Sequence, residues 1–205
     1  MSYPLIETIE YKGYNIEVNY DQHADSPDQW GNDDAFIVHD HRSFSVERKG
    51  FDPADIFEDL KAGKTLYDGY HIFPLYAYIH SGVALSLGRS SYPFTCNWDT
   101  SFAGFVLVKK TKGWSWRKDK AETIAKAIVE EWNCYLSGDV YGYTSEVGSC
   151  WGFYGSEGME DMIQNAKSEI DYEIKQKTKT HFDQLKVWIK NKVPLLKRQS
   201  FQYSF

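Results

Sequence analysis

The feature that most constrains the fold of this chain is a block at residues 134–155 in which glycine and aromatic residues are closely mixed. The block holds five glycines and six aromatic residues within 22 positions. Glycine lets the backbone approach its neighbours closely, whereas Trp, Tyr and Phe bury more area than other side chains. The mixture therefore predicts backbone packed directly against rings, a surface of defined shape, but it indicates no particular reaction.

Length and composition indicate one domain, or one domain with a helical appendage. The chain has 205 residues, of which 42% are hydrophobic and 25% are charged, as is usual for a globular protein with its own core. The aromatic share of 17% is high, and such a surplus occurs in β-rich cores as well as at interfaces and clefts. The sequence shows no long apolar run and no signal-peptide pattern, so we expect a cytoplasmic protein without a membrane segment.

The net charge of −6 is unevenly distributed. Residues 1–41 hold nine acidic residues and one lysine, residues 42–155 hold thirteen of each sign, and residues 156–205 hold nine basic and seven acidic residues. A surface that binds duplex DNA normally has the opposite sign, because it neutralises phosphates. We therefore expect no direct binding to duplex DNA, and an acidic N-terminal segment that faces either a basic partner or solvent.

The pattern of polar and apolar residues predicts an α+β fold, with a mainly antiparallel sheet, one packed central helix and a C-terminal helical element. We predict a hairpin that turns at Lys12 and Gly13, and a short helix over residues 53–61 with Asp52 as its N-cap. The central helix is expected over residues 119–137, with Asp119 as its cap. Further strands are expected at residues 35–38, 70–79, 83–87, 102–109, 139–144 and 150–154.

The C-terminal part, residues 156–205, is expected to form a helical extension of an α+β domain at residues 1–155. Ser156 is the expected N-cap, residues 178–180 are expected to bend or split the helix, and Pro194 is expected to end it. A second apolar stripe on this helix predicts either an internal packing face or association of two copies of the chain. The stripe consists of Phe182, Leu185, Trp188 and Ile189.

Four segments place polar groups beside glycine or aromatic residues: residues 39–42, 80–82, 96–100 and 149–155. Together with Gly138-Asp139-Val140-Tyr141-Gly142-Tyr143 they resemble a family of uncharacterised proteins encoded by phages and other mobile elements, whose pattern includes C-x-W-D-[ST] and S-C-W-G-F-Y-G. The resemblance covers roughly residues 14–155, with departures at residues 30–33 and 43–44. It implies a phage or mobile-element protein that acts inside a bacterial cell.

The hypothesis that uses most of the sequence is a binding protein without a cofactor. Its rings would form a platform for a protein or a base, with carboxylates that fix the orientation of the bound partner. The expected partner is a host or phage protein such as a defence nuclease, which the chain would inhibit. The alternative is that these rings only join the sheet to the central helix. The candidate binding residues are Trp98, Asp99, Asp139, Tyr141, Tyr143, Trp151, Phe153, Tyr154, Asp33 and Asp34.

The alternative function is a metal-dependent hydrolase that acts on a nucleotide or a nucleic acid. Asp21, His23 and Asp25 would lie on one side of an extended strand and offer metal ligands. The candidate catalytic residues of such an enzyme are His39, His41, His80 and Asp99. A thiol enzyme would instead need Cys96 or Cys150 beside a base such as His80. The three cysteines have no C-x-x-C spacing, which argues against a disulfide framework and a structural zinc site.

Overall fold

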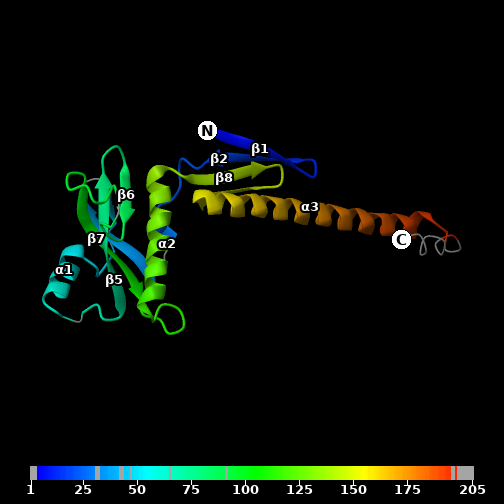
Figure 1. Cartoon of the computed structure of the whole chain (residues 1–205). Helices are drawn as coiled ribbons and strands as arrows, with labels where there is room; N and C mark the ends of the chain where they lie inside the picture. Colours follow the sequence, from blue (N-terminus) through cyan, green and yellow to red (C-terminus); the bar gives the residue numbers. More distant parts are fainter. Residues whose placement is uncertain are drawn as a thin grey trace.

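Two antiparallel sheets, each covered by a long helix, make up the fold of this computed structural model (Figure 1). The structure describes residues 4–30, 33–41, 44–46, 48–64, 66–90, 92–194 and 197, without the side chains of residues 30, 41, 44 and 45. The predicted α+β class with mainly antiparallel strands is confirmed. The elements in chain order are β1 (Leu5–Tyr11), β2 (Tyr14–Tyr20), η1 (Pro27–Trp30), β3 (Ala35–His41), β4 (Phe44–Val46), α1 (Pro53–Lys61), β5 (Tyr70–Ile79), β6 (Val83–Ser86), β7 (Thr100–Lys109), α2 (Lys118–Ser137), β8 (Val140–Ser145), β9 (Ser149–Tyr154) and α3 (Gly155–Lys192).

The four-stranded sheet has the order β1-β2-β8-β9. Its first hairpin turns at Lys12 and Gly13, both of which have positive φ angles of 51° and 81°, as a two-residue hairpin turn requires. One face of this sheet packs against α3. The buried side chains there are Ile16, Val18, Tyr143, Met162, Ala166 and Ile170.

The five-stranded sheet has the order β4-β3-β7-β5-β6 and carries a helix on each face. On one face, α2 contributes the buried residues Ala121, Ala125, Val129 and Trp132. On the other face, Ile56 of α1 packs against buried side chains of β3 and β7. At the centre of the sheet, a Cβ atom on Gly104 would lie 2.2 Å from the carbonyl oxygen of Val38. Only glycine therefore fits at this position.

The central helix α2 begins one residue earlier than the sequence predicts. Its N-cap is Arg117, whose side chain makes no capping hydrogen bond. The carboxylate of Asp119 accepts two hydrogen bonds from the Arg117 guanidinium, at 3.0 and 2.9 Å. The prediction that Asp119 caps the helix is therefore wrong. At the other end, Gly138 has a φ of 79° and closes the helix as predicted.

The last helix, α3, is continuous over 38 residues, so the predicted bend or split at residues 178–180 is absent. It begins at Gly155 with Tyr154 as its N-cap, which makes the predicted cap at Ser156 wrong. All its buried residues lie in the first half, at Met162, Ala166 and Ile170. The second half extends past the end of the four-stranded sheet and projects away from the rest of the molecule (Figure 1).

The domain boundary expected at residue 155 coincides with the first residue of α3, yet residues on both sides of it share one core. Tyr143 of β8 and Met162 of α3 are fully buried in the same cluster. Ile174 also packs against this cluster, and the Lys177 ammonium donates a 3.2 Å hydrogen bond to the Tyr14 hydroxyl, so the helix contacts the sheet well past residue 155 and projects beyond these contacts. Among the described residues, no helix is long and apolar enough to cross a membrane.

Candidate functional site

The aromatic residues of the β8–β9 hairpin lie on both faces of the four-stranded sheet. Tyr141 and Phe153 are paired across the hairpin and pack toward α3. Gly142 faces the opposite side, where a Cβ atom would lie 2.1 Å from the ring of Trp151. The strand pairing shifts by one residue between Tyr141 and Gly142, and Gly152 has a positive φ of 84°. This irregularity lets the Trp151 ring cover the backbone of Gly142 while Phe153 faces the core. The ring packed against backbone is the contact that the mixed block predicts.

Tyr143 of the same hairpin is fully buried beneath α3. Burial and the neighbouring Glu169 carboxylate raise the pKa of its hydroxyl. Because the hydroxyl stays protonated, it cannot act as a base. Tyr143 is therefore part of the core, although the sequence assigned it to a binding platform.

The ends of the hairpin join neighbouring segments through backbone and hydroxyl groups. The Tyr154 hydroxyl donates a hydrogen bond of 2.6 Å to the carbonyl oxygen of Asp25. The amide of Asp139 donates to the carbonyl oxygen of Cys134, and its own carbonyl accepts from the amide of Gly155. Tyr154 and Asp139 therefore connect the ends of the β8–β9 hairpin to the neighbouring segments of the chain.

A second aromatic group lies on the five-stranded sheet, in the corner before β7. The side chain of Trp98 is 96% exposed, and Tyr92 in the same corner is also exposed. Beside them, Nδ1 of His80 and Sγ of Cys96 both approach Oδ2 of Asp99, at 3.6 and 3.7 Å. The structure thus brings together Trp98, Asp99, His80 and Cys96, whereas Trp151 belongs to the other sheet.

This corner does not have the geometry of a thiol enzyme. A nucleophilic thiol must bond directly to its base, but Asp99 here lies between Cys96 and His80. His39 is on β3, is only 1% exposed and lines a different cleft, so it is not part of this corner. The side chain of His41 lies outside the described residues. Of the predicted catalytic residues whose side chains the structure describes, His80 and Asp99 are the two that lie close together.

The other candidate carboxylates have local partners. Asp33 forms an ion pair with Arg48, and Asp34 forms one of 2.9 Å with Lys109. The Asp21 carboxylate accepts a hydrogen bond from the backbone amide of His23, which is a common arrangement in exposed turns. In the part of the chain that the structure describes, no three His, Cys, Asp or Glu side chains form a group able to hold a metal ion. The metal set Asp21, His23 and Asp25 therefore gains no support.

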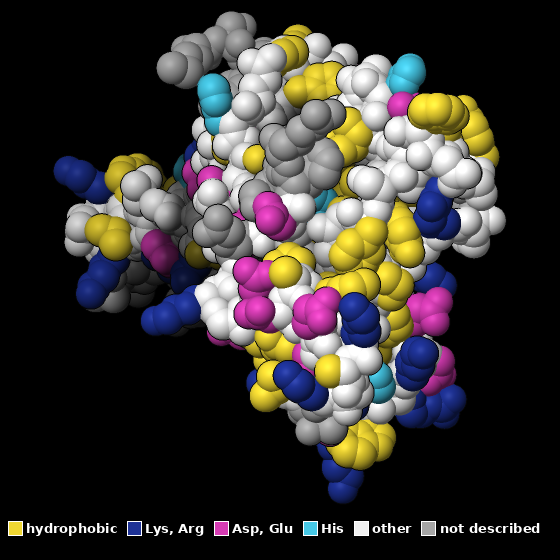
Figure 2. Space-filling view, turned by 90° about the vertical axis from the view of Figure 1, so that its left-hand side faces the viewer, with side chains coloured by type: hydrophobic (Ala, Val, Ile, Leu, Met, Phe, Trp, Pro, Cys, Tyr) yellow, Lys and Arg dark blue, Asp and Glu magenta, His cyan; other side chains and the backbone are white. Residues whose placement is uncertain are grey.

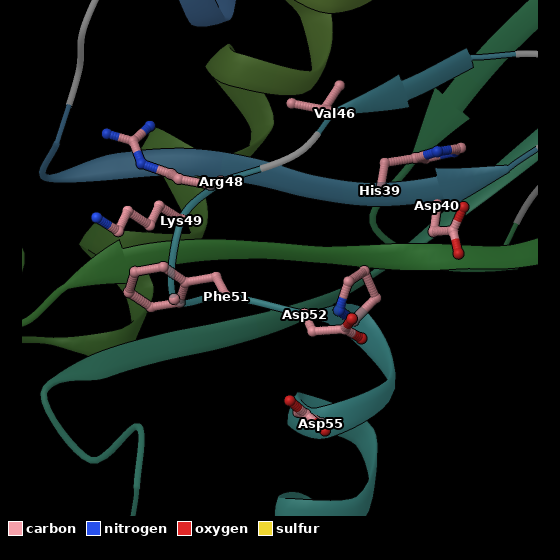
Figure 3. A pocket seen from close by; sticks show the side chains of 10 residues that line it. His39, Asp40, Val46, Arg48, Lys49, Phe51, Asp52 and Asp55 are labelled. Carbon is pink, nitrogen blue, oxygen red and sulfur yellow. The ribbon is translucent and has the colours of Figure 1, made fainter.

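A cleft of about 770 Å³ lies between β3, the segment before α1 and the start of α1 (Figure 3). Asp40, Asp52 and Asp55 lie on one side of it, with Arg48 and Lys49 on the other (Figure 3). Several of these groups have structural roles. Asp52 caps α1 through the amide of Ala54, and the Arg48 guanidinium lies 4.0 Å from the ring centre of Phe36. The cleft is therefore charged and open, and two of its charged groups, Asp52 and Arg48, take part in structural contacts.

Comparisons with known proteins give no match, since no family model, no curated protein and no solved structure matches the chain. Sequence reasoning found Trp98 through its neighbours in the C-x-W-D-[ST] pattern. It missed Tyr92 and also Arg89, whose guanidinium donates a hydrogen bond to the carbonyl oxygen of Phe94 in the same corner. No pattern in the sequence indicated either residue.

Proposed function

We propose that this chain acts by binding another protein, with Trp98 as the anchor of the interface. The observation that carries the proposal is the 96% exposure of this tryptophan. An exposed Trp on a monomer leaves apolar area in water, whereas the same ring in a partner's pocket is among the strongest contributors to binding. A structural role for the ring would require contacts that so exposed a side chain cannot make.

The backbone that presents Trp98 is held in place before any partner arrives. The Arg89 guanidinium donates hydrogen bonds to the carbonyl oxygen of Phe94 and to the side chain of Asn97. The Thr100 amide donates to the carbonyl oxygen of Cys96, and the Ile79 amide to that of Asp99. Because ordering a loop on binding costs free energy, a preformed loop retains more of the energy gained by burying the ring.

The projecting half of α3 supports the same kind of function. Residues 175–192 contain six lysines and one aspartate, a net charge of +5, whereas residues 1–174 carry 15 basic and 28 acidic residues, a net charge of −13. Trp188 in this half is 56% exposed. A basic arm attached to an acidic body steers partners electrostatically and fixes their orientation.

The motif resemblance supplies the biological part of the proposal. A phage or mobile-element protein in the cytoplasm of a bacterial cell would bind a host or phage protein of a defence or nucleic-acid-processing system, such as a defence nuclease, and inhibit it. The hydrolase alternative gains no comparable support, because the described His and Asp side chains do not gather into a metal-binding group.

A capture experiment with matched variants tests the proposal. The tagged chain is expressed in bacteria that carry defence systems, bound proteins are identified by mass spectrometry, and the affinity of the purified pair is measured. Trp98→Ala should weaken binding about 30-fold or more, which corresponds to a loss of roughly 2 kcal/mol or more for a central Trp. The variant should keep the melting temperature of the parent, because the side chain is exposed.

Trp116→Ala provides the control, since this ring is also exposed, at 65%, but belongs to the loop before α2. It should change the affinity less than threefold. Equal affinities of the parent and Trp98→Ala would refute the role of Trp98.

A further inference from the structure

The second feature without a structural explanation is the buried carboxylate of Asp59, on the inner side of α1. Asp59 is 3% exposed, and its Oδ1 atom has no hydrogen-bond partner within the described ranges of the chain. Burying a carboxylate oxygen that has no partner is costly, and a native protein that keeps one usually has a use for it. Leu or Asn at this position would avoid the cost.

Asp59 lines a cavity of about 250 Å³ at the end of the five-stranded sheet where α1 ends and β5 and α2 begin (Figure 1). We call it the α1–α2 cavity. The polar groups on its wall are Asp59, Lys64, Tyr67, Asp68, His71 and Lys118. Its volume lies just below the range of typical ligand pockets, so it suits a molecule smaller than a nucleotide.

Backbone hydrogen bonds hold the wall of this cavity in place. The amide of Lys64 donates to the carbonyl oxygen of Asp59 at 3.0 Å, and the amide of Tyr70 donates to that of Tyr67 at 2.9 Å. Nε2 of His71 lies 3.2 Å from the carbonyl oxygen of Trp116. As the carbonyl can only accept, Nε2 is the donor in this contact. The cavity is therefore preformed rather than assembled by a ligand.

The positive and negative charges on the wall of the cavity are equal in number but differ in how deeply they are buried. Asp59 is buried, whereas the lysines Lys64 and Lys118 are exposed, and Lys118 is the first residue of the 20-residue helix α2. A helix N-terminus adds partial positive charge. Burial and the carboxylates of Asp55 and Asp59 raise the pKa of Tyr67, so its hydroxyl remains a neutral donor beside the buried carboxylate. Figure 2 shows acidic side chains over the middle of this face, and Lys and Arg side chains mixed with acidic ones toward its lower end.

We propose that the α1–α2 cavity binds a small zwitterion, whose ammonium group pairs with Asp59 and whose anionic group, a carboxylate or a phosphate, pairs with Lys64 and Lys118. A neutral cavity with two carboxylates and two ammonium groups on its wall favours a ligand that is itself neutral overall and dipolar. The buried carboxylate requires a cation, because only an opposite charge offsets its desolvation. The ring of Tyr67 offers the ammonium group a second favourable contact.

The test measures thermal shifts and calorimetric binding of the full chain with four probes. 4-Aminobutyrate and phosphoethanolamine carry both charges, with a carboxylate in one and a phosphate in the other. Ethylamine and inorganic phosphate each carry one charge. At 100 times its Kd, the preferred zwitterion should raise the melting temperature by about 5–10 °C. The stronger of the two zwitterions identifies the anionic group.

Three variants separate binding from a structural role. Asp59→Asn should raise the melting temperature of the unliganded protein, because it removes the buried charge, and should abolish the response to the zwitterion. Lys118→Gln should fold normally and bind at least tenfold more weakly. Glu58→Gln, an exposed neighbour on α1, should bind as the parent does. Failure of both zwitterions to bind, equal binding of a singly charged probe, unchanged binding by Asp59→Asn, or a lower melting temperature of that variant would overturn the proposal.

Discussion

Replacing Gly142 by alanine should destabilise the protein through one identifiable contact. The new Cβ atom would lie 2.1, 2.5 and 2.8 Å from three carbon atoms of the Trp151 ring. Ordinary contacts between carbon atoms are about 3.5–4.0 Å, so the ring or the strand must move by more than 1 Å. Overpacking of this kind costs roughly 1–3 kcal/mol, and the lower backbone entropy of the unfolded alanine chain offsets about 0.4–1 kcal/mol of it.

The net loss of about 1–2 kcal/mol should lower the melting temperature by roughly 2–8 °C for a chain of this size. Urea unfolding followed by far-UV circular dichroism gives the free energy directly. Gly88→Ala is the matched control, because nothing lies within 4 Å of its Cβ position. This control should leave the stability unchanged within about 0.5 kcal/mol.

A double-mutant cycle identifies the contact as the cause. In a Trp151→Ala background the ring is absent, so Gly142→Ala should be neutral or slightly stabilising. The coupling free energy between the two substitutions should then reach about 1–2 kcal/mol. An equal loss of stability with and without the Trp151 ring would refute the reasoning, since the cost would then arise elsewhere.

Three further predictions concern the caps, an ion pair and α3. Asp52→Ala should lower the free energy of unfolding by about 1 kcal/mol, because Asp52 caps α1. Asp119→Ala should lower it by less, because Asp119 does not cap α2. The urea midpoints of the two variants give the comparison. Lys12 lowers the pKa of Asp171 below its ordinary value of 3.8, and Asp171 raises the pKa of Lys12 above 10.5. The stabilisation is therefore present between these values and is lost at lower or higher pH, so Asp171→Asn should lower the urea midpoint at pH 7 but have little effect at a pH low enough to protonate Asp171 in the folded protein. Two copies that associate through the stripe of Phe182, Leu185, Trp188 and Ile189 should sediment as a dimer, and added salt should strengthen this dimer because it screens the repulsion between the lysines. Trp188→Asp should then sediment as a monomer. A parent protein that is monomeric at every salt concentration would contradict this association.

Local signals in the sequence predicted much of the fold. The short helix at residues 53–61 and its cap Asp52 were predicted correctly, because Asp, Pro and a following apolar pattern act within a few residues. The hairpin at Lys12 and Gly13 was predicted for the same reason. At Asp119 the same rule failed, because the neighbouring Arg117 binds the carboxylate that would otherwise cap the helix.

The division into two sheets could not be predicted, because it depends on pairing between distant segments. β2 pairs with β8, more than 120 residues later in the chain, for example through Val18 and Tyr143. No local pattern specifies such a partner. For the same reason, the sequence could not show that Trp98 and Trp151, which were predicted to share one aromatic platform, belong to different sheets.

Exposure was the other property that the sequence could not supply. Composition does not distinguish Tyr143, which is fully buried, from Trp98, which is almost fully exposed. The hydrogen bonds of Arg89 that hold the loop around Trp98, and the Oδ1 atom of Asp59 without a partner, likewise depend on contacts in three dimensions. Both proposals therefore depend on observations of the structure, although Trp98 itself was a candidate from the sequence.

The affinity of the captured partner for Trp98→Ala, compared with the parent and with Trp116→Ala, tests the central claim most directly. Binding through a preformed aromatic anchor predicts a loss of about 30-fold or more for Trp98→Ala and less than threefold for Trp116→Ala, with unchanged melting temperatures for both. Equal affinities for all three proteins would contradict the claim, because a side chain this exposed would then serve neither the fold nor the interface.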